Sequence, residues 1–70
     1  MPLVVAPIGK ELKIIKILVD ANTKKHLANL GFVVDEKLTI MSVVNGSVIC
    51  LIKDGRVALD KEIAMKIFVQ

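Results

Sequence analysis

Two dipeptides, Asn45-Gly46 and Asp54-Gly55, most constrain how this 70-residue chain can fold. Asn-Gly and Asp-Gly between apolar runs are the strongest short hairpin signals, because both central residues of a type I′ turn need a positive φ. The apolar, strand-like runs beside them are residues 37–44, 47–53 and 56–59. The second half of the chain therefore predicts a meander of three antiparallel strands.

The first half predicts a strand followed by a short helix. Residues 11–19 are rich in β-branched side chains, and their alternation slips once at Ile14-Ile15, as at a β-bulge. Residues 20–23 then supply several possible N-caps, and residues 24–30 predict two helical turns that end at Gly31, where a left-handed C-cap glycine belongs. Residues 2–9, which contain two prolines, are expected to be extended and turn-like.

The C-terminus predicts a helical turn over residues 61–65, capped by Asp60, and a last short strand at Ile67-Phe-Val69. Pairing of that strand with the first one would remove an exposed edge. The predicted fold is mainly β (small α+β): an SH3-like five-stranded β-barrel with one short helix after the first strand and a helical turn before the last strand. Residues 1–70 are expected to form a single domain, because no linker, repeat or low-complexity segment interrupts them.

The chain is unusually apolar for its size. Hydrophobic residues make up 54% of it and the mean hydropathy is +0.67, yet a chain this short buries only about 60% of the surface that its unfolded form exposes. Part of the apolar surplus must therefore lie on the surface, where contiguous patches usually mark contacts with other molecules. We expect a protein that binds a partner and that self-associates weakly, including by edge-to-edge strand pairing.

Charge and aromatic content disfavour nucleic-acid binding. The net charge is +3, but the lysines are scattered except for Lys24-Lys25, and the chain has one arginine, two phenylalanines and neither tryptophan nor tyrosine. A single-strand-binding surface needs clustered basic residues and aromatic stacking platforms. A small nucleic-acid-binding barrel remains the alternative, and a steep salt dependence of binding would identify it.

Targeting signals are not apparent. The apolar runs are far shorter than the roughly 18–20 residues of a membrane-spanning helix, and the first nine residues lack the positive segment of a signal peptide. The single cysteine cannot form an internal disulfide, which small secreted folds usually need. We expect a cytoplasmic protein without direct membrane insertion.

Four segments together resemble the FeoA family, the small cytoplasmic accessory proteins of bacterial ferrous iron transport. They cover nearly the whole chain and follow one another in the family's order. They are Glu11-Leu-Lys-Ile-Ile-Lys-Ile17, His26-Leu-Ala-Asn-Leu-Gly-Phe32, Lys37-Leu-Thr-Ile-Met41, and Arg56-Val-Ala-Leu-Asp60 with Ala64 and Ile67-Phe-Val69. One departure is Asp35, because the family often carries a glycine soon after the Leu-Gly turn.

The resemblance implies a non-catalytic adaptor or regulator of ferrous iron uptake. It also implies association with the cytosolic region of FeoB, the membrane Fe(II) transporter with a GTP-binding domain, and so recruitment to the inner face of the membrane. The sequence holds no P-loop and no Ser/His/Asp arrangement, so no enzyme activity is expected.

The residues of this chain do not suggest a metal site of its own. An Fe(II) site needs His, carboxylate or thiolate ligands that converge from at least three positions. His26 is expected on the helix surface, Cys50 as a small buried hydrophobe, and Asp35-Glu36 as a solvated turn. We therefore predict no metal ligands and no cofactor.

A partner-binding surface is predicted around the short helix and its Leu-Gly turn. Its residues are Lys24, Lys25, Leu27, Leu30, Phe32 and Val33. Phe32 follows a glycine at a turn, where it could project outward. The alternative is that Leu27, Leu30 and Phe32 anchor the helix on the barrel, which is the usual fate of helical leucines. Docking of a proline-rich peptide is disfavoured, because its groove is built from tryptophan and tyrosine.

Overall fold

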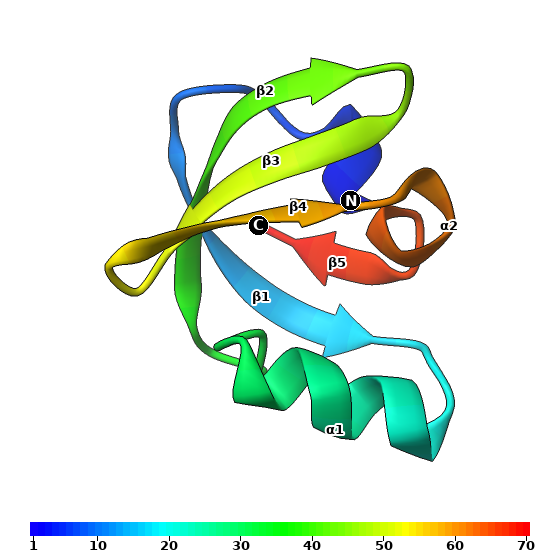
Figure 1. Ribbon diagram of the computed structural model, residues 1–70. Helices are drawn as coiled ribbons and strands as arrows, with labels where there is room; N and C mark the ends of the chain where they lie inside the picture. The colour runs from blue at the N-terminus through cyan, green and yellow to red at the C-terminus, as the bar shows by residue number, and fades with distance from the viewer.

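The computed structural model describes residues 1–70 and contains five strands, two α-helices and a short 3-10 helix (Figure 1). In chain order they are η1 (Leu3–Val5), β1 (Glu11–Ile17), α1 (Ala21–Asn29), β2 (Lys37–Val44), β3 (Ser47–Ile52), β4 (Gly55–Leu59), α2 (Lys61–Ala64) and β5 (Ile67–Val69). No helix is both long and apolar enough to cross a membrane.

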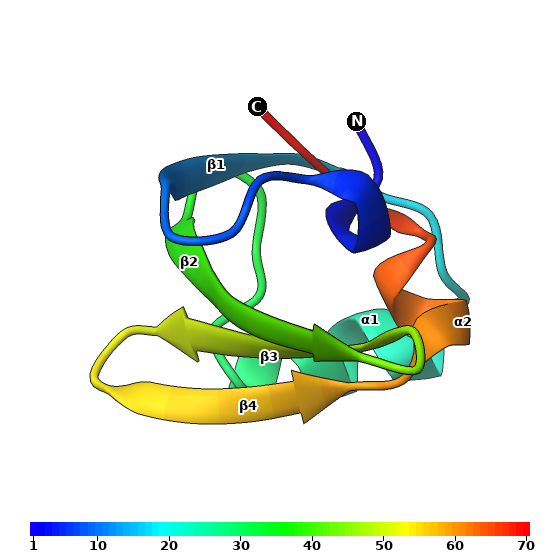
Figure 2. The same cartoon turned by 90° about the horizontal axis from the view of Figure 1, so that it is seen from above.

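The strands form one antiparallel sheet in the order β4-β3-β2-β1-β5, which confirms the predicted return of the last strand to the first. The sheet curves so that its two ends lie on opposite sides of the core (Figure 2). It does not close, because β4 and β5 are not paired. The expected closed, SH3-like barrel is therefore not confirmed, and the fold is a small α+β fold with an open five-stranded sheet.

The N-terminal residues explain why the sheet stays open. Val69 N–H donates to the carbonyl oxygen of Met1 at 2.8 Å, and Pro2 forms a β-bridge with Phe68. These contacts occupy the outer edge of β5, so β4 has no strand edge on which to close. The segment is not simply extended as expected: residues 3–5 form η1, which buries Leu3 completely.

The core is entirely apolar. Sixteen residues are buried, and none of them is polar or charged. The strands supply most of them by alternation, since successive side chains of a strand point to opposite faces. The buried residues are Leu3, Ala6, Leu12, Ile14, Ile17, Leu27, Phe32, Leu38, Ile40, Val48, Cys50, Ile52, Leu59, Ala64, Ile67 and Val69.

The predicted bulge in β1 is confirmed. Ile14 pairs with Val69 and Lys16 with Phe68, so that Ile15 is the extra, exposed residue. The extra residue shifts the alternation by one position. As a result Ile14 and Ile17, three residues apart, both point into the core.

One of the two hairpin turns lies where it was predicted, and the other is displaced. Asn45 and Gly46 have φ values of 53° and 84°, as a type I′ turn requires. The β3–β4 turn is instead centred on Lys53 and Asp54, with Lys53 at φ 54°, and Gly55 already pairs with Ile52. Prediction of Asp54-Gly55 as the central pair was therefore wrong by one residue.

The alternation of β3 and β4 cannot distinguish these two turns. Moving the central pair by one residue shifts the pairing by two, and a shift of two keeps the same side chains on the same face. The observed turn is supported by Lys53, whose Nζ lies 2.8 Å from Oε1 of Glu36.

Helix α1 begins three residues earlier than predicted, with Asp20 as its N-cap, and ends at Asn29, one residue before the predicted end, with Gly31 in the expected position just after it. Gly31 has a φ of 103°. Its N–H donates to Ala28 O at 3.0 Å, and Phe32 N–H donates to Leu27 O at 2.9 Å, which together form a Schellman motif. This motif turns the chain so that Phe32 packs into the core beside Leu27.

A second tight turn follows at residues 33–36, where Glu36 N–H donates to Val33 O at 3.1 Å. Asp35 occupies its third position with a φ of 77°, a conformation that favours glycine in a type II turn. The positive φ at this position thus explains why a glycine is expected here from the family resemblance. Asp35 adopts the same backbone, as a short polar side chain can.

We expect Asp35→Val to lower the free energy of unfolding by about 1–2 kcal/mol, because a β-branched side chain is strained at this φ. Asp35→Asn is the matched control, since asparagine tolerates the left-handed region and differs only by the charge. Lys13 Nζ is 4.0 Å from the Asp35 carboxylate and both groups are exposed, so the lost ion pair contributes little. Urea denaturation of the three proteins measures the difference. Equal losses in both variants would contradict the role of the backbone.

Candidate functional site

The structure divides the predicted partner-binding residues into two groups. Leu27 is 1% exposed and Phe32 is 0% exposed, so both belong to the core. Their assignment to a contact surface was therefore wrong for a physical reason: the Schellman motif turns Phe32 inward instead of letting it project. The alternative interpretation, that these residues anchor the helix, is the one that the structure supports.

The other four residues remain on the surface. Leu30 is 38% exposed and Val33 is 41% exposed, while Lys24 and Lys25 are exposed on α1. Val34, which was not predicted, is also exposed and directly continues this apolar segment. We refer to Lys24, Lys25, Leu30, Val33 and Val34 as the helix-end surface. It combines exposed apolar side chains at the C-terminal end of α1 and just beyond it with two lysines in the first half of the helix.

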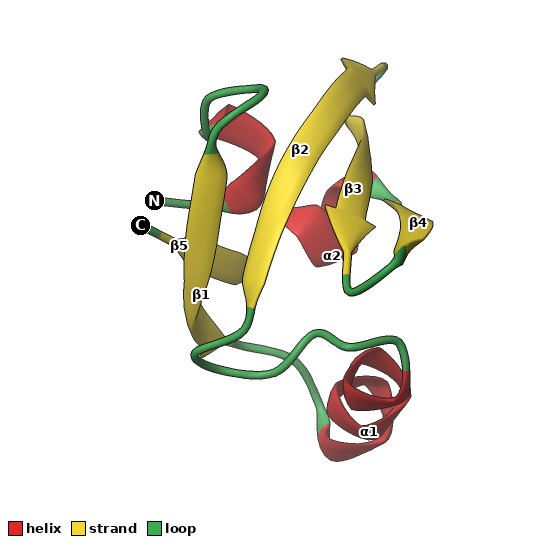
Figure 3. Ribbon diagram, turned by 90° about the vertical axis from the view of Figure 1, so that its left-hand side faces the viewer, coloured by secondary structure: helices red, strands yellow, loops and turns green.

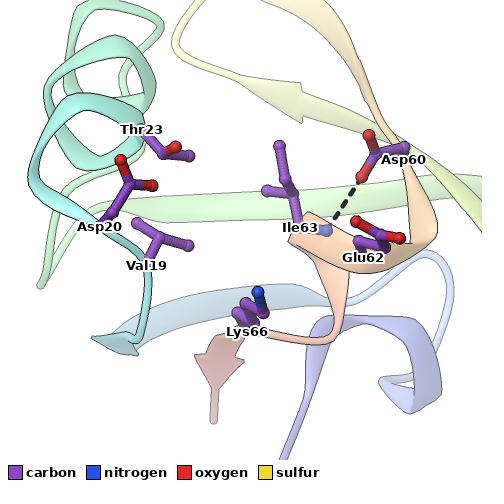
Figure 4. A pocket seen from close by; sticks show the side chains of 7 residues that line it. All are labelled: Val19, Asp20, Thr23, Asp60, Glu62, Ile63 and Lys66. Carbon is purple, nitrogen blue, oxygen red and sulfur yellow. Dashed lines mark hydrogen bonds between the residues drawn. The ribbon is translucent and has the colours of Figure 1, made fainter.

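A small cleft of about 260 Å³ lies between the start of α1 and the short helix α2 (Figure 4). Its lining comes from two segments about forty residues apart in the sequence. The lining residues are Val19, Asp20, Thr23, Asp60, Glu62, Ile63 and Lys66. In Figure 4 Asp20 and Thr23 stand on one side, Asp60 and Glu62 on the other, and Lys66 lies at the base.

The pairing of β1 with β5 builds this cleft. Ile17 pairs with Ile67, and the next residue, Leu18, donates its N–H to Lys66 O at 2.9 Å. The chain leaving β1 and the chain entering β5 are thereby held side by side. Asp60 N-caps α2, and its Oδ1 accepts from Ile63 N–H at 2.9 Å.

The cleft is predominantly negative. It carries three carboxylates and one ammonium group, and the interaction with the Thr23 side chain is the main reason that the pKa of Asp20 lies below its usual value. Asp20 is therefore ionised at neutral pH. The carboxylates do not converge, since the structure contains no group of three or more His, Cys, Asp and Glu side chains that could hold a metal ion.

The other candidate ligands lie apart from one another. His26 is exposed on α1, whereas Cys50 is fully buried in β3, where burial raises the pKa of its thiol to about 11. Glu36 is held by its ion pair with Lys53, which lowers the pKa of Glu36 and raises that of Lys53. A neutral, buried thiol is a poor nucleophile and a poor metal ligand.

Sequence reasoning missed the cleft although it identified parts of it. Asp60 was expected as a helix N-cap and Asp20 was one of several possible N-caps, but nothing in the local sequence brings the two together. Their proximity depends on the β1–β5 register, which is a long-range feature. The predicted return of the last strand to the first was the one signal that could have indicated it.

Comparison with known proteins agrees with the architecture. The family model described as the FeoA domain matches residues 1–70. No curated protein gives a significant sequence match.

Three solved structures share this fold. The chain superposes on the crystal structure of an iron uptake regulatory protein (FeoA) with a TM-score of 0.87 and 21% identity, covering 100% of this chain and 93% of that one. The solution structure of iron(II) transport protein A from Clostridium thermocellum gives 0.90 and 26% identity, over 100% of this chain and 44% of that one. The FeoA protein from Chlorobium tepidum gives 0.88 and 17% identity, over 99% and 68%.

Truncation of Phe32 tests its place in the core. We expect Phe32→Ala to cost about 3–5 kcal/mol of unfolding free energy or to prevent folding, and Leu30→Ala to cost less than about 1 kcal/mol. Phe32→Leu, a milder change, keeps the comparison measurable if the alanine variant does not fold. Urea denaturation provides the values. Similar costs at Phe32 and Leu30 would mean that Phe32 is not an anchor.

The buried thiol predicts a loss of stability in alkali. Below pH 9 Cys50 is neutral in both states, but between pH 9 and 11 the unfolded chain loses this proton while the native chain keeps it. The free energy of unfolding should therefore fall by up to about 2–3 kcal/mol across this range. Cys50→Ala is the control, because it removes the thiol and leaves every charged side chain in place. Parallel pH profiles for the two proteins would contradict the raised pKa.

Proposed function

The chain belongs to the FeoA domain family, which is associated with ferrous iron transport, and from this we propose that it is a non-catalytic accessory protein that binds the cytosolic region of a FeoB-type iron transporter. The observation that carries the proposal is the family match over all 70 residues. The names of its structural relatives, an iron uptake regulatory protein and an iron(II) transport protein, support the same process.

The helix-end surface is the part of the molecule that we assign to this contact. Leu30, Val33 and Val34 lie within five residues of the chain and expose apolar side chains to solvent. Apolar side chains at the centre of a contact supply most of its binding energy, because they leave water on association. The partner would cover this segment.

Lys24 and Lys25 add two exposed positive charges in the first half of α1. Charges at the rim of an interface act mainly on the rate of encounter and on specificity, and contribute less to the final affinity. We therefore propose that the partner presents an acidic surface around an apolar patch. The protein would act on the cytosolic side of the membrane, recruited there by the transporter.

Calorimetric titration of the chain with the cytosolic GTP-binding region of a FeoB-type transporter tests the proposal. We expect saturable binding at low and at moderate salt, because apolar contacts are not screened by ions. Titrations with and without guanine nucleotide show whether the GTPase cycle is involved. Absence of binding under every condition would refute the proposed contact. Affinity for a nucleic acid that collapses with salt would favour the nucleic-acid-binding alternative instead.

Single substitutions locate the contact. Val33→Asp should weaken binding about tenfold or more, because it places a charge in the centre of the apolar segment. Val5→Asp is the matched control: Val5 is also exposed, and it lies on η1, at the opposite end of the molecule from α1 (Figure 1). Urea denaturation should show similar unfolding free energies for both variants. Equal loss of binding in the two would exclude the helix-end surface.

Lys24→Glu combined with Lys25→Glu separates encounter from affinity. We expect slower association at low salt and little change in the dissociation rate, measured by stopped-flow mixing. At high salt the association rates of this variant and of the parent should converge, because the steering is screened. A faster dissociation rate with unchanged association would mean that the lysines lie inside the contact.

A further inference from the structure

The two outer edges of the sheet differ in whether another segment of the chain covers them. The outer edge of β5 is covered by the N-terminus, through two hydrogen bonds between Met1 and Val69 of 2.8 and 3.0 Å and the bridge from Pro2 to Phe68. The outer edge of β4 has no such cover. Figure 3 shows β4 at the end of the row of strands, with no element beyond it.

The register of the β3–β4 hairpin fixes which groups of β4 point outward. Ile52 and Gly55 close a two-residue turn and are therefore a hydrogen-bonded pair. By alternation, the N–H and C=O groups of Arg56 and Ala58 point away from β3, and both residues are exposed. Asp60 continues the strand in an extended conformation with φ −71° and ψ 166°, so its N–H points the same way.

Helix α2 does not obstruct this edge. It packs against β3 and η1, and the side chain of Lys61 lies over Gly46 at the β2–β3 turn. The helix therefore folds back over the sheet, and the outer hydrogen-bonding edge of β4 stays accessible.

We propose that the β4 edge binds the β4 edge of a second copy of this chain, in antiparallel orientation about a two-fold axis at Ala58. This inference goes beyond the proposed function and does not depend on it. In this register the two Ala58 residues exchange both of their backbone hydrogen bonds. Asp60 N–H of each copy adds one more bond, to Arg56 C=O of the other copy.

Charge complementarity favours a second copy of this chain as the molecule that binds the β4 edge. It also favours this register over the others. Centring the pair on Ala58 sets Arg56 of each copy opposite Asp60 of the other, which gives two cross-strand pairs of opposite charge. Centring on Val57 would set Asp54 opposite Asp60, and centring on Arg56 would set two arginines face to face; both oppose like charges. Among the registers centred on Arg56, Val57 and Ala58, only the one at Ala58 sets opposite charges against each other, as an isologous interface requires.

The outer face of the sheet continues across the pair. Ile49 is the cross-strand neighbour of Ala58 within one copy, so the pairing creates a row from Ile49 through two alanines to Ile49 of the second copy. The association stops at two copies, because the β5 edge of each is already covered by Met1 and Pro2. A pair of short strands buries little surface, so the dimer is weak.

Sedimentation velocity from about 10 µM to about 1 mM, the range of weak association, is the first test. We expect a reversible monomer–dimer equilibrium for the parent protein. Ala58→Lys and Ala58→Glu should each raise the dissociation constant about fivefold or more, because like charges then meet at the axis. An equimolar mixture of the two variants should dimerise again. Thr39→Lys, on β2, two strands from the edge, is the matched control and should dimerise like the parent.

Three outcomes would overturn the proposal. If the parent protein stays monomeric up to about 1 mM, the β4 edge does not pair with a second copy, and only a strand of another protein could bind it. If Ala58→Lys and Ala58→Glu dimerise as strongly as the parent protein, the interface lies elsewhere. If circular dichroism shows that Ala58→Lys and Ala58→Glu are both folded but their mixture does not associate, the two-fold axis does not lie at Ala58.

Cysteine cross-linking tests the register separately. Hydrogen-bonded antiparallel residues have Cα atoms about 5.5 Å apart, within the span of a disulfide. Ala58→Cys should therefore form an oxidised dimer faster than Arg56→Cys, whose thiols would be well separated in this register. Native Cys50 is fully buried and does not interfere. Equal rates for the two variants would contradict pairing about Ala58.

Discussion

The antiparallel pairing of β1 with β5 is the constraint on which most of this small structure depends. It joins the two ends of the chain, and the bulge at Ile15 allows Ile14 and Ile17 to face the core together. The same pairing brings the start of α1 beside α2 and so creates the acidic cleft. Met1 and Pro2 then seal the outer side of β5. A chain of 70 residues gains from this arrangement, because its core is too small to tolerate frayed ends.

Local signals predicted much of this fold from the sequence. The bulge, the Asn45-Gly46 turn, the glycine after α1 and the Asp60 cap each depend on the φ or the hydrogen bonding of a few consecutive residues, and each lies where it was expected. The displaced β3–β4 turn shows the limit of such signals. A shift of two residues preserves the alternation, and in the observed register Lys53 contacts Glu36, which is distant in sequence.

The candidate site was less predictable because it depends on side-chain direction at turns. Phe32 was expected at a surface because it follows a glycine, but that glycine is the C′ residue of a Schellman motif, which normally packs the next side chain against the helix. The apolar residues that remain exposed are instead Leu30, Val33 and Val34, beyond the reach of that contact. Burial of Leu3 by a segment expected to be extended has the same origin, since only the tertiary fold places η1 over the core.

The distribution of exposed groups suggests a division between two surfaces. The helix-end surface offers apolar side chains and two exposed lysines, whereas the β4 edge offers backbone groups and the charges of Arg56 and Asp60. The first suits a partner of different sequence, because its only charges, Lys24 and Lys25, are both positive and do not complement each other. The second suits an identical strand. Helix α1 and the β4 edge lie on different parts of the molecule (Figure 3). Pairing through β4 would therefore leave both helix-end surfaces free. The dimer would present two of these surfaces at once to a membrane-bound, oligomeric or multidomain partner. Linked contacts of that kind strengthen binding without any new interface, so the proposed dimer would raise the apparent affinity for the proposed partner.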